Sequence, residues 1–265
     1  MDEADLSESW VISAGLGEDA SFDLQMSAVY QARVIMVDPT PRAAVHYSEL
    51  VRATTQGTQA TPEYGEAVKS DLEFAVGVRL QSLKFYEAAL WSEDGELVLF
   101  NPENPEHVSM SVVPPSGDPN DLAHLRVPSV SLPSIASREG VDLNSLSILK
   151  LDIEGAEANV IQNLVETRIR PRQILVEFDL LRKPPFHQNL IRVKEVDRVL
   201  QHVGYERVYS SGHGEFAYLL SRPARDVKRN VHSNQALTNG LFAGTRNPTG
   251  LDMVATLMVT ESFDK

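Results

Sequence analysis

Apolar, strand-like runs that end in aspartate are the feature that most restricts how this chain can fold. Three such runs end at Asp38, Asp152 and Asp179. Segments with helical periodicity lie between the runs, and alternating strands and helices predict a mostly parallel sheet covered on both faces. Ligands of such folds bind beyond the carboxyl ends of the strands. We therefore predict an α/β fold in which these acids face a ligand cleft.

The remaining elements are predicted from periodicity and turn residues. A strand is expected at 10–14 and a helix at 21–30. Gly140 and Gly204 are expected to end two later helices, because glycine adopts the left-handed conformation at low cost. We also expect two strands at 82–91 and 96–100 joined by the tight turn S-E-D-G, an irregular loop at 101–122, a helix that runs to Glu166 and a closing hairpin at 205–220.

Composition narrows the classes of function. The chain has 265 residues, a net charge of -13 and no cysteine. The negative charge disfavours nucleic acid and anionic membrane surfaces as partners, since phosphate contacts need clustered Lys and Arg. Disulfides, thiolate zinc sites and cysteine nucleophiles are excluded, and no His-rich spacing predicts a metal site. We expect a cytoplasmic protein, because neither a signal-peptide pattern nor a run of about 18 apolar residues is present.

The character of the sequence changes after Ser221. The stretch S-R-P-A-R-D-V-K-R-N-V-H is locally basic, and N-G-L-F-A-G-T-R-N-P-T-G further on is rich in turn residues. We predict one domain over residues 1–221 and an extension of unknown order over residues 222–265.

The stretch G-L-G-E-D-A, residues 15–20, fits the dinucleotide pattern G-x-G-x-x-G/A. Asp38 lies about where that pattern expects an acid on the ribose hydroxyls. NAD and S-adenosylmethionine (SAM) both carry such a ribose. Glu18 and Asp19 favour SAM, because carboxylates at a helix N-terminus repel a pyrophosphate but suit an ammonium and a sulfonium. The alternative is an ordinary strand-turn-helix whose acids stabilise the helix N-terminus.

The stretch S-I-L-K-L-D-I-E-G-A-E places Asp152, Glu154 and Glu157 within six residues. Such acids can orient a methyl donor, take a proton from a substrate hydroxyl or hold a divalent ion. Glu154 and Glu157 share a helix face if the helix has begun by Glu154, and Glu157 can also be first-turn charge alone. Lys150 points the same way as Asp152 and can pair with an acid.

Two further groups are candidates for the acceptor side. Glu177 and Asp179 occupy alternate positions at the end of the next strand, so they are predicted to face the same side. They either line an acceptor pocket or are solvated. We favour His107 among the histidines, because it lies in the irregular loop that can cover the cleft, with His187 and His213 as alternatives.

These stretches resemble the FkbM-type family of SAM-dependent methyltransferases. The resemblance rests on V-I-S-A-G-L-G-E-D-A-S-F-D, V-D-P-T-P-R, H-V-S-M-S, I-L-K-L-D-I-E-G-A-E and Q-I-L-V-E-F-D, in family order across residues 10–220. It implies a Rossmann-like class I methyltransferase fold, with a seven-stranded sheet and a C-terminal antiparallel hairpin. It also implies methyl transfer from SAM, commonly to a hydroxyl oxygen of a sugar, lipid or secondary metabolite.

The resemblance implies roles for single residues. Gly15 and Gly17 would pass the methionine part of SAM, with Glu18 or Asp19 near its ammonium, and Asp38 would hold the ribose. The expected cofactor-binding set is Ala14, Gly15, Gly17, Glu18, Asp19, Asp38, Pro39 and Asp152. The expected catalytic set, near the transferred methyl and the acceptor, is Asp152, Glu154, His107 and Glu177.

Other interpretations stay open at this point. The family usually has helices before its first strand, whereas the first strand here begins almost at the N-terminus, so a truncated N-terminus or a lid from elsewhere is expected. An NAD-dependent oxidoreductase fits the glycine pattern. A non-catalytic SAM-fold module that binds a partner through residues 222–265 is a third interpretation.

Overall fold

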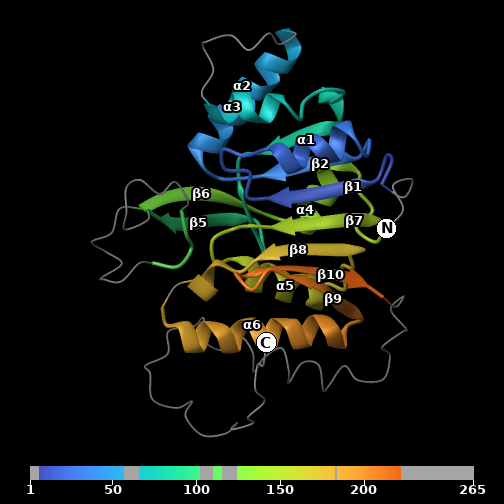
Figure 1. Cartoon of the computed structure of the whole chain (residues 1–265). Coiled ribbons are helices and arrows are strands. Elements are labelled where there is room, and N and C mark those ends of the chain that lie inside the picture. Colours follow the sequence, from blue (N-terminus) through green and yellow to red (C-terminus); the bar gives the residue numbers. More distant parts are fainter. Residues whose placement is uncertain (1–5, 57–65, 102–109, 115–123, 183, 222–265) are drawn as a thin grey trace, which may run out of the picture. The chain divides into compact units, whose positions relative to one another are not determined.

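The structure is a computed structural model that describes residues 6–56, 66–101, 110–114, 124–182 and 184–221 (Figure 1). All of these residues belong to one compact unit, Met1–Arg225, and the second unit, Asp226–Lys265, lies outside the described residues. The domain boundary expected at residue 221 stays a prediction. Among the described residues, no helix has the length and apolar character that crossing a membrane requires.

The main sheet has seven strands in the order β3-β2-β1-β7-β8-β10-β9. The strands are β1 (Trp10–Ala14), β2 (Arg33–Val37), β3 (Leu83–Tyr86), β7 (Leu146–Leu151), β8 (Gln173–Glu177), β9 (Tyr205–Ser210) and β10 (Glu215–Leu220). Neighbours from β3 to β8 pair in parallel, whereas β10 is antiparallel to both β8 and β9. The predicted α/β class, the mostly parallel sheet and the closing hairpin are confirmed.

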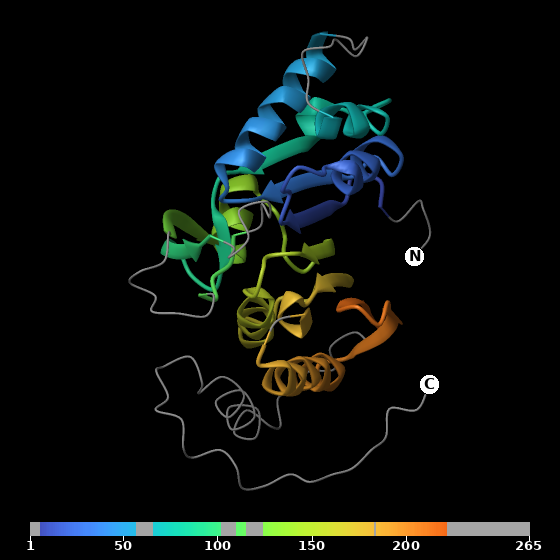
Figure 2. The same cartoon turned by 60° about the vertical axis from the view of Figure 1, so that its left-hand side comes forward.

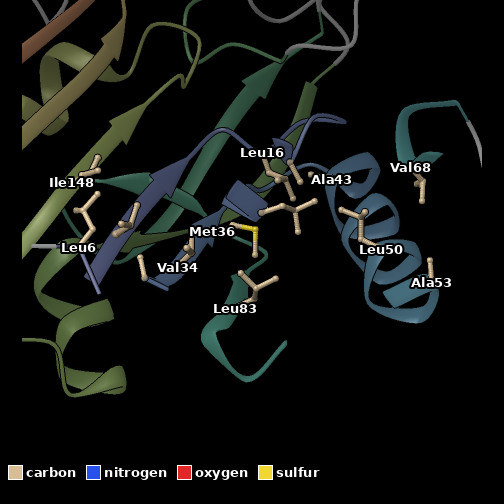
Figure 3. Packing of buried hydrophobic residues seen from close by; sticks show 14 residues of the cluster. Leu6, Leu16, Val34, Met36, Ala43, Leu50, Ala53, Val68, Leu83 and Ile148 are labelled. Atoms are coloured by element: carbon tan, nitrogen blue, oxygen red, sulfur yellow. The ribbon is translucent and has the colours of Figure 1, made fainter. Parts of the chain in front are cut away.

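One face of the sheet is covered by α1 (Ser21–Ala28), α2 (Pro41–Gln56) and α3 (Glu66–Leu72). Their apolar side chains, among them Leu50 and Val68, form one buried cluster with Val34, Met36 and Ile148 of the strands (Figure 3). Burying each such side chain contributes about 1.5–3 kcal/mol relative to exposure. This cluster therefore fixes β1 and β2 side by side, with their carboxyl ends level.

The opposite face is covered by α6 (Phe186–His202), whose Asp197 Oδ1 accepts a hydrogen bond of 3.0 Å from the buried Tyr218 of β10. The helix α5 (Glu157–Glu166) packs against α6. A 3-10 helix, η4 (Asp179–Arg182), follows β8 and also contacts α6. In Figure 2 the blue and teal helices lie by the blue strands at the top, and the yellow-green and orange helices lie to the left of and below the yellow and orange strands.

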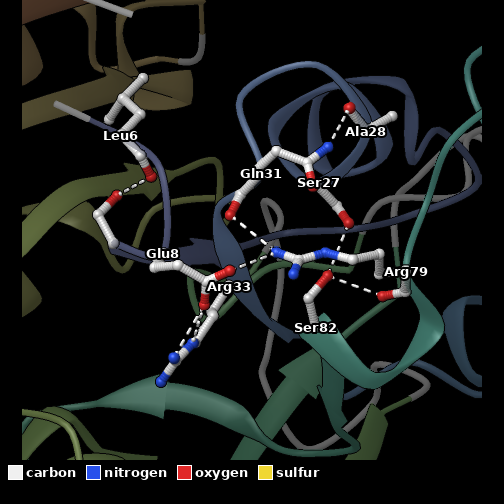
Figure 4. Close-up of polar contacts among 9 residues, drawn as sticks. Leu6, Glu8, Ser27, Ala28, Gln31, Arg33, Arg79 and Ser82 are labelled. Atoms are coloured by element: carbon white, nitrogen blue, oxygen red, sulfur yellow. Dashed lines mark hydrogen bonds and ion pairs between the residues drawn. The ribbon is translucent and has the colours of Figure 1, made fainter. Parts of the chain in front are cut away.

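Polar contacts join the amino end of β2 to the segment before β3 (Figure 4). Glu8 forms ion pairs with Arg33 at 2.8 Å and with Arg79 at 2.9 Å, and Arg79 also donates to the carbonyl of Gln31. Both pairs are solvent-exposed, and such pairs contribute little to stability. Their consequence is positional, because they set where the chain enters η2 (Leu80–Ser82) and β3.

A second, small sheet has the order β4-β6-β5, with β4 (Ala89–Trp91), β5 (Gly95–Phe100) and β6 (His124–Ser131). The prediction of one strand over 82–91 that pairs with 96–100 through a tight turn is wrong. The run is divided into β3 and β4, which join different sheets, and β6 lies between β4 and β5. The sequence pattern did not predict β6, because Pro128 lies within it and proline is unfavourable inside a central strand.

The helix ends agree closely with the glycine positions. The helix α4 (Leu132–Glu139) begins at Ser131, whose hydroxyl accepts from the Ser134 N–H, and its C-cap is Gly140 at φ 68°, as expected. The C-cap of α6 is Val203, and Gly204 follows at φ 104°. The left-handed residue is the predicted Gly204, but it lies one position after the observed C-cap, where glycine is most favoured.

Candidate functional site

The carboxyl ends of β1, β2 and β7 meet at Gly15. Its N–H donates to the Val37 carbonyl at 3.0 Å, and the Asp152 N–H donates to the Ala14 carbonyl at 3.0 Å. Gly15 has a φ of +90°, and a Cβ there would lie 1.8 Å from the Asp152 carbonyl oxygen. Only glycine fits this approach without displacing backbone. The first residue of the predicted glycine loop is therefore required by the fold itself.

Asp38 fixes the loop at Gly17. It is only 5% exposed. Its Oδ2 accepts from the Gly17 N–H at 2.9 Å, and its Oδ1 accepts from the Thr40 N–H and hydroxyl at 2.8 and 2.6 Å. A carboxylate has about four acceptor positions, so these bonds leave capacity for one more donor. Pro39 stands between Asp38 and Thr40 and leads into α2.

The two acids inside the loop have protein partners. Glu18 forms an exposed ion pair with Arg42 of α2 at 2.8 Å. Asp19 accepts from the Ser21 N–H at 2.9 Å, and its bonds with Ser21 hold the pKa of Asp19 below its ordinary value. Asp19 therefore stabilises the N-terminus of α1, which is the alternative role the sequence left open. This does not test whether either acid also meets a ligand.

The N-terminus of α1 is tied to the more distant helices. Asp71 of α3 accepts from the Ala20 N–H at 2.8 Å through Oδ2, and the same oxygen lies 2.7 Å from Nε2 of His46 in α2. Both side chains are buried. Residues of α2 and α3 thus support the glycine loop. The sequence pattern predicted no role for either residue, because Asp71 and His46 are 51 and 26 positions from Ala20.

Lys150 joins the glycine loop to Asp152. Its Nζ donates to the Gly15 carbonyl at 3.2 Å and lies 3.8 Å from Asp152 Oδ2. Partial burial raises the pKa of Asp152, Lys150 opposes this rise, and Glu177 and Glu154 add to it. A carboxylate whose pKa is raised is a better proton acceptor. Pairing of Lys150 with an acid, one of the predicted outcomes, is confirmed.

The sequence pattern did not predict one buried acid near the glycine loop. Asp23 of α1 is 1% exposed, and desolvation raises its pKa to about 6, against the opposing charge of Lys150. Ser13 of β1 is buried as well, in register with Lys150. The available signal was an aspartate among the apolar residues of a short helix, at the position where Leu or Ala is usual.

The turn after β7 carries the most specific sequence motif. Glu154 has a φ of 51° and Gly155 a φ of 103°. Glu154 thus precedes α5, so the condition for a shared helix face with Glu157 is not met. Ser111 donates its hydroxyl to the Glu154 carbonyl, and a Cβ at Gly155 would lie 3.0 Å from Val113. Residues 110–114 therefore lie directly against this turn.

Glu177 ends β8 and forms an ion pair with Arg182 of η4. Arg182 also donates through Nε to the His213 carbonyl at 3.0 Å. The strand ends at Glu177, and Asp179 lies in η4, where it is 6% exposed. The strand alternation that predicted both acids on one side therefore stops before Asp179.

The predicted histidines contribute little to this region in the described structure. His107 lies outside the described residues. His187 is exposed in the first turn of α6, and His213 is exposed in the closing hairpin, where it contributes its backbone carbonyl. Among the described residues, no group of three His, Cys, Asp or Glu side chains is arranged to hold a metal ion.

A protein-family model matches most of the chain. The Methyltransferase FkbM domain matches residues 17–207, which include Asp38, the motif after β7 and Glu177. The chain belongs to the FkbM methyltransferase family. The resemblance predicted from the sequence is confirmed, and the family is one of methyltransferases. A comparison with curated proteins gave no significant match.

Two solved structures match the FkbM chain at low identity. A variant of MtNAS is 11% identical with a TM-score of 0.35, and the match covers 82% of this chain and 54% of that one. The chain therefore spans about half the length of that protein. A variant of the 16S rRNA (adenine(1408)-N(1))-methyltransferase from Catenulisporales acidiphilia is 13% identical with a TM-score of 0.35, covering 84% of this chain and 90% of that one.

Proposed function

We propose that the chain transfers a methyl group from SAM to a hydroxyl oxygen of a small-molecule or glycosidic acceptor. The observation that carries this proposal is the acid-rich cradle built around Gly15. Glu18 and Asp19 lie in the loop, and Asp38 and Asp152 border it. Among the described residues, these four acids outnumber the two cations that contact the loop, Lys150 and Arg42.

The charge of the cradle fits SAM better than a dinucleotide. SAM carries an ammonium and a sulfonium, which carboxylates attract, whereas NAD would bring a pyrophosphate against Glu18 and Asp19. Each such repulsion amounts to about 1 kcal/mol or more at partly exposed range. The absence of a side chain at Gly15 lets the loop backbone lie against the Asp152 carbonyl, and Asp38 retains one acceptor position for a ribose hydroxyl.

Residues of the chain divide the binding task. Ala14, Gly15 and Gly17 would lie along the methionine part, Glu18 or Asp19 near its ammonium, and Asp38 with Pro39 at the ribose. Bound SAM supplies an already activated methyl group, so orienting the acceptor oxygen in line supplies much of the rate.

Acid–base assistance comes from the turn after β7. Asp152 is the best placed base, because its side chain is 39% exposed and its pKa is raised. It would accept the hydroxyl proton as the new oxygen–methyl bond forms. Glu154 and Glu177 add negative charge beside it. Residues 110–114 border the acceptor side of this turn.

Calorimetric titration with SAM, S-adenosylhomocysteine and NADH tests the proposal. We expect micromolar binding of the first two ligands and none of NADH. Binding of NADH alone would favour an oxidoreductase instead. An acceptor screen with radiolabelled SAM then tests the hydroxyl assignment, and label found only on nitrogen or carbon would contradict it.

A further inference from the structure

Glu157 occupies an unusual position below the turn after β7. It is the first residue of α5 and is fully buried, at 0% exposure. Its Oε1 accepts from the Gly155 N–H at 2.8 Å and from the Ile153 N–H at 3.3 Å. Its Oε2 is buried and has no hydrogen-bond partner within the part of the chain that the structure describes.

The two N–H groups that Glu157 binds flank Glu154. Glu154 has a left-handed φ of 51°, which is uncommon for a residue with a side chain. One carboxyl oxygen therefore holds the backbone on both sides of the strained residue. This contact fixes the turn that presents Asp152 and Glu154 to the site.

The charged groups around Glu157 come from two elements, η4 and α6. Asp179 of η4 is close enough to disfavour a second negative charge, and Arg192 of α6 opposes that effect. Arg192 is itself committed to Asn159 Oδ1 at 2.9 Å and is influenced by Glu195 of the same helix. An ionised carboxylate without a direct charge partner is costly to bury. Burial raises the pKa of Glu157 to about 8, and Asp179 adds to this rise.

We propose that Glu157 is a positioning residue. In its neutral, protonated form, the Glu157 side chain holds the 152–155 turn. Neutral Glu157 keeps an acceptor oxygen for the two backbone N–H groups and places no second charge near Asp179. Ionised Glu157 adds buried negative charge against the backbone of the turn that carries Asp152 and Glu154. The effect of this device on SAM binding rests on the proposed function; its effect on folding does not.

The sign of the pH dependence follows from proton binding. The folded protein keeps a proton on Glu157 up to about pH 8, whereas the unfolded chain releases it near the ordinary value of 4.5. This group therefore stabilises the fold most at low pH, and the contribution is lost as pH rises from 4.5 to about 8. Glu157→Gln mimics the neutral carboxyl, so it removes this dependence.

Urea denaturation of the full chain at about pH 5.5 and about pH 8.5 tests the folding part. We expect the midpoint of the wild type to fall more between the two pH values than that of E157Q, with E157Q the more stable at the higher pH. Equal falls in both proteins would overturn the proposal. Failure of E157Q to fold would overturn it as well, because an isosteric neutral side chain should satisfy the same N–H groups.

Calorimetric titration with SAM tests the link to the site. We expect E157Q to bind within about threefold of the wild type at low pH and more tightly at high pH, and E157A to bind at least about tenfold more weakly at both. Equal weakening in E157Q and E157A would show that the ionised form is the one required. If the wild type itself does not bind SAM, the proposed function fails, and the urea comparison still decides the state of Glu157.

Discussion

Replacing Gly15 with alanine should damage the fold far more than the same change at Gly17. A Cβ at Gly15 would lie 1.8 Å from the Asp152 carbonyl oxygen, so the two strand ends must separate by more than about 1 Å. Such overpacking typically costs about 1–3 kcal/mol. The positive φ of +90° adds about 1–2 kcal/mol for a residue with a side chain. We expect G15A to lose about 2–5 kcal/mol of unfolding free energy in total.

Gly17 is the matched control, because it belongs to the same loop and also has a positive φ, of +56°. A Cβ there would meet no described atom within 4 Å. G17A should therefore lose only the conformational part, about 1 kcal/mol. The two variants differ in steric contact and hardly in backbone strain.

Urea denaturation followed by circular dichroism measures both losses. At a typical slope of about 1–3 kcal/mol per molar urea, G15A should shift the midpoint downward by about 1 M or more, and G17A by much less. Equal midpoints for the two variants would refute the reasoning, since they would show that the close approach of Gly15 to Asp152 is absent in solution.

Two further substitutions test how the loop is held. Asp38→Ala removes the acceptor of the Gly17 N–H and of Thr40, so SAM binding should become too weak to measure by calorimetry. Thr40→Val removes one hydroxyl bond and should cost only about 1 kcal/mol of stability. Normal SAM binding by D38A would contradict the assignment of Asp38 to the ribose. Lys150→Met removes the cation that lowers the pKa values of Asp152 and Asp23. Both pKa values should rise, so the SAM affinity of K150M should fall more at acid than at alkaline pH. K150R should retain most of the affinity, and a loss in K150M that does not vary with pH would contradict this role.

Much of the scaffold could be predicted because its signals are local. The strands β1, β2, β7 and β8 are short apolar runs, and Asp38 and Asp152 are their polar ends. Gly140 ends a helix because left-handed backbone favours glycine wherever it occurs. These features depend on a few neighbouring residues, so they can be read without knowing the fold.

The parts that could not be predicted depend on distant contacts. Pro128 lies inside β6, in register with Glu96 of β5. The residues next to Pro128 in the sequence do not indicate a strand there. In the sequence, Glu157 and Asp23 cannot be distinguished from the exposed acids, yet both are buried. Asp71 supports Ala20 across 51 positions. Only the assembled fold determines which acids lose their water, and this determines their chemistry.

The glycine loop is anchored at two points, Gly15 and Gly17, before any ligand arrives. Asp38 holds the Gly17 N–H from 21 positions away, and Lys150 holds the Gly15 carbonyl from 135 positions away. A loop already ordered by the protein loses little conformational entropy when a ligand binds. The affinity of this cradle is then determined mainly by the contacts that the ligand makes, and a fragment that ends before β7 would lose that advantage because it lacks the second anchor.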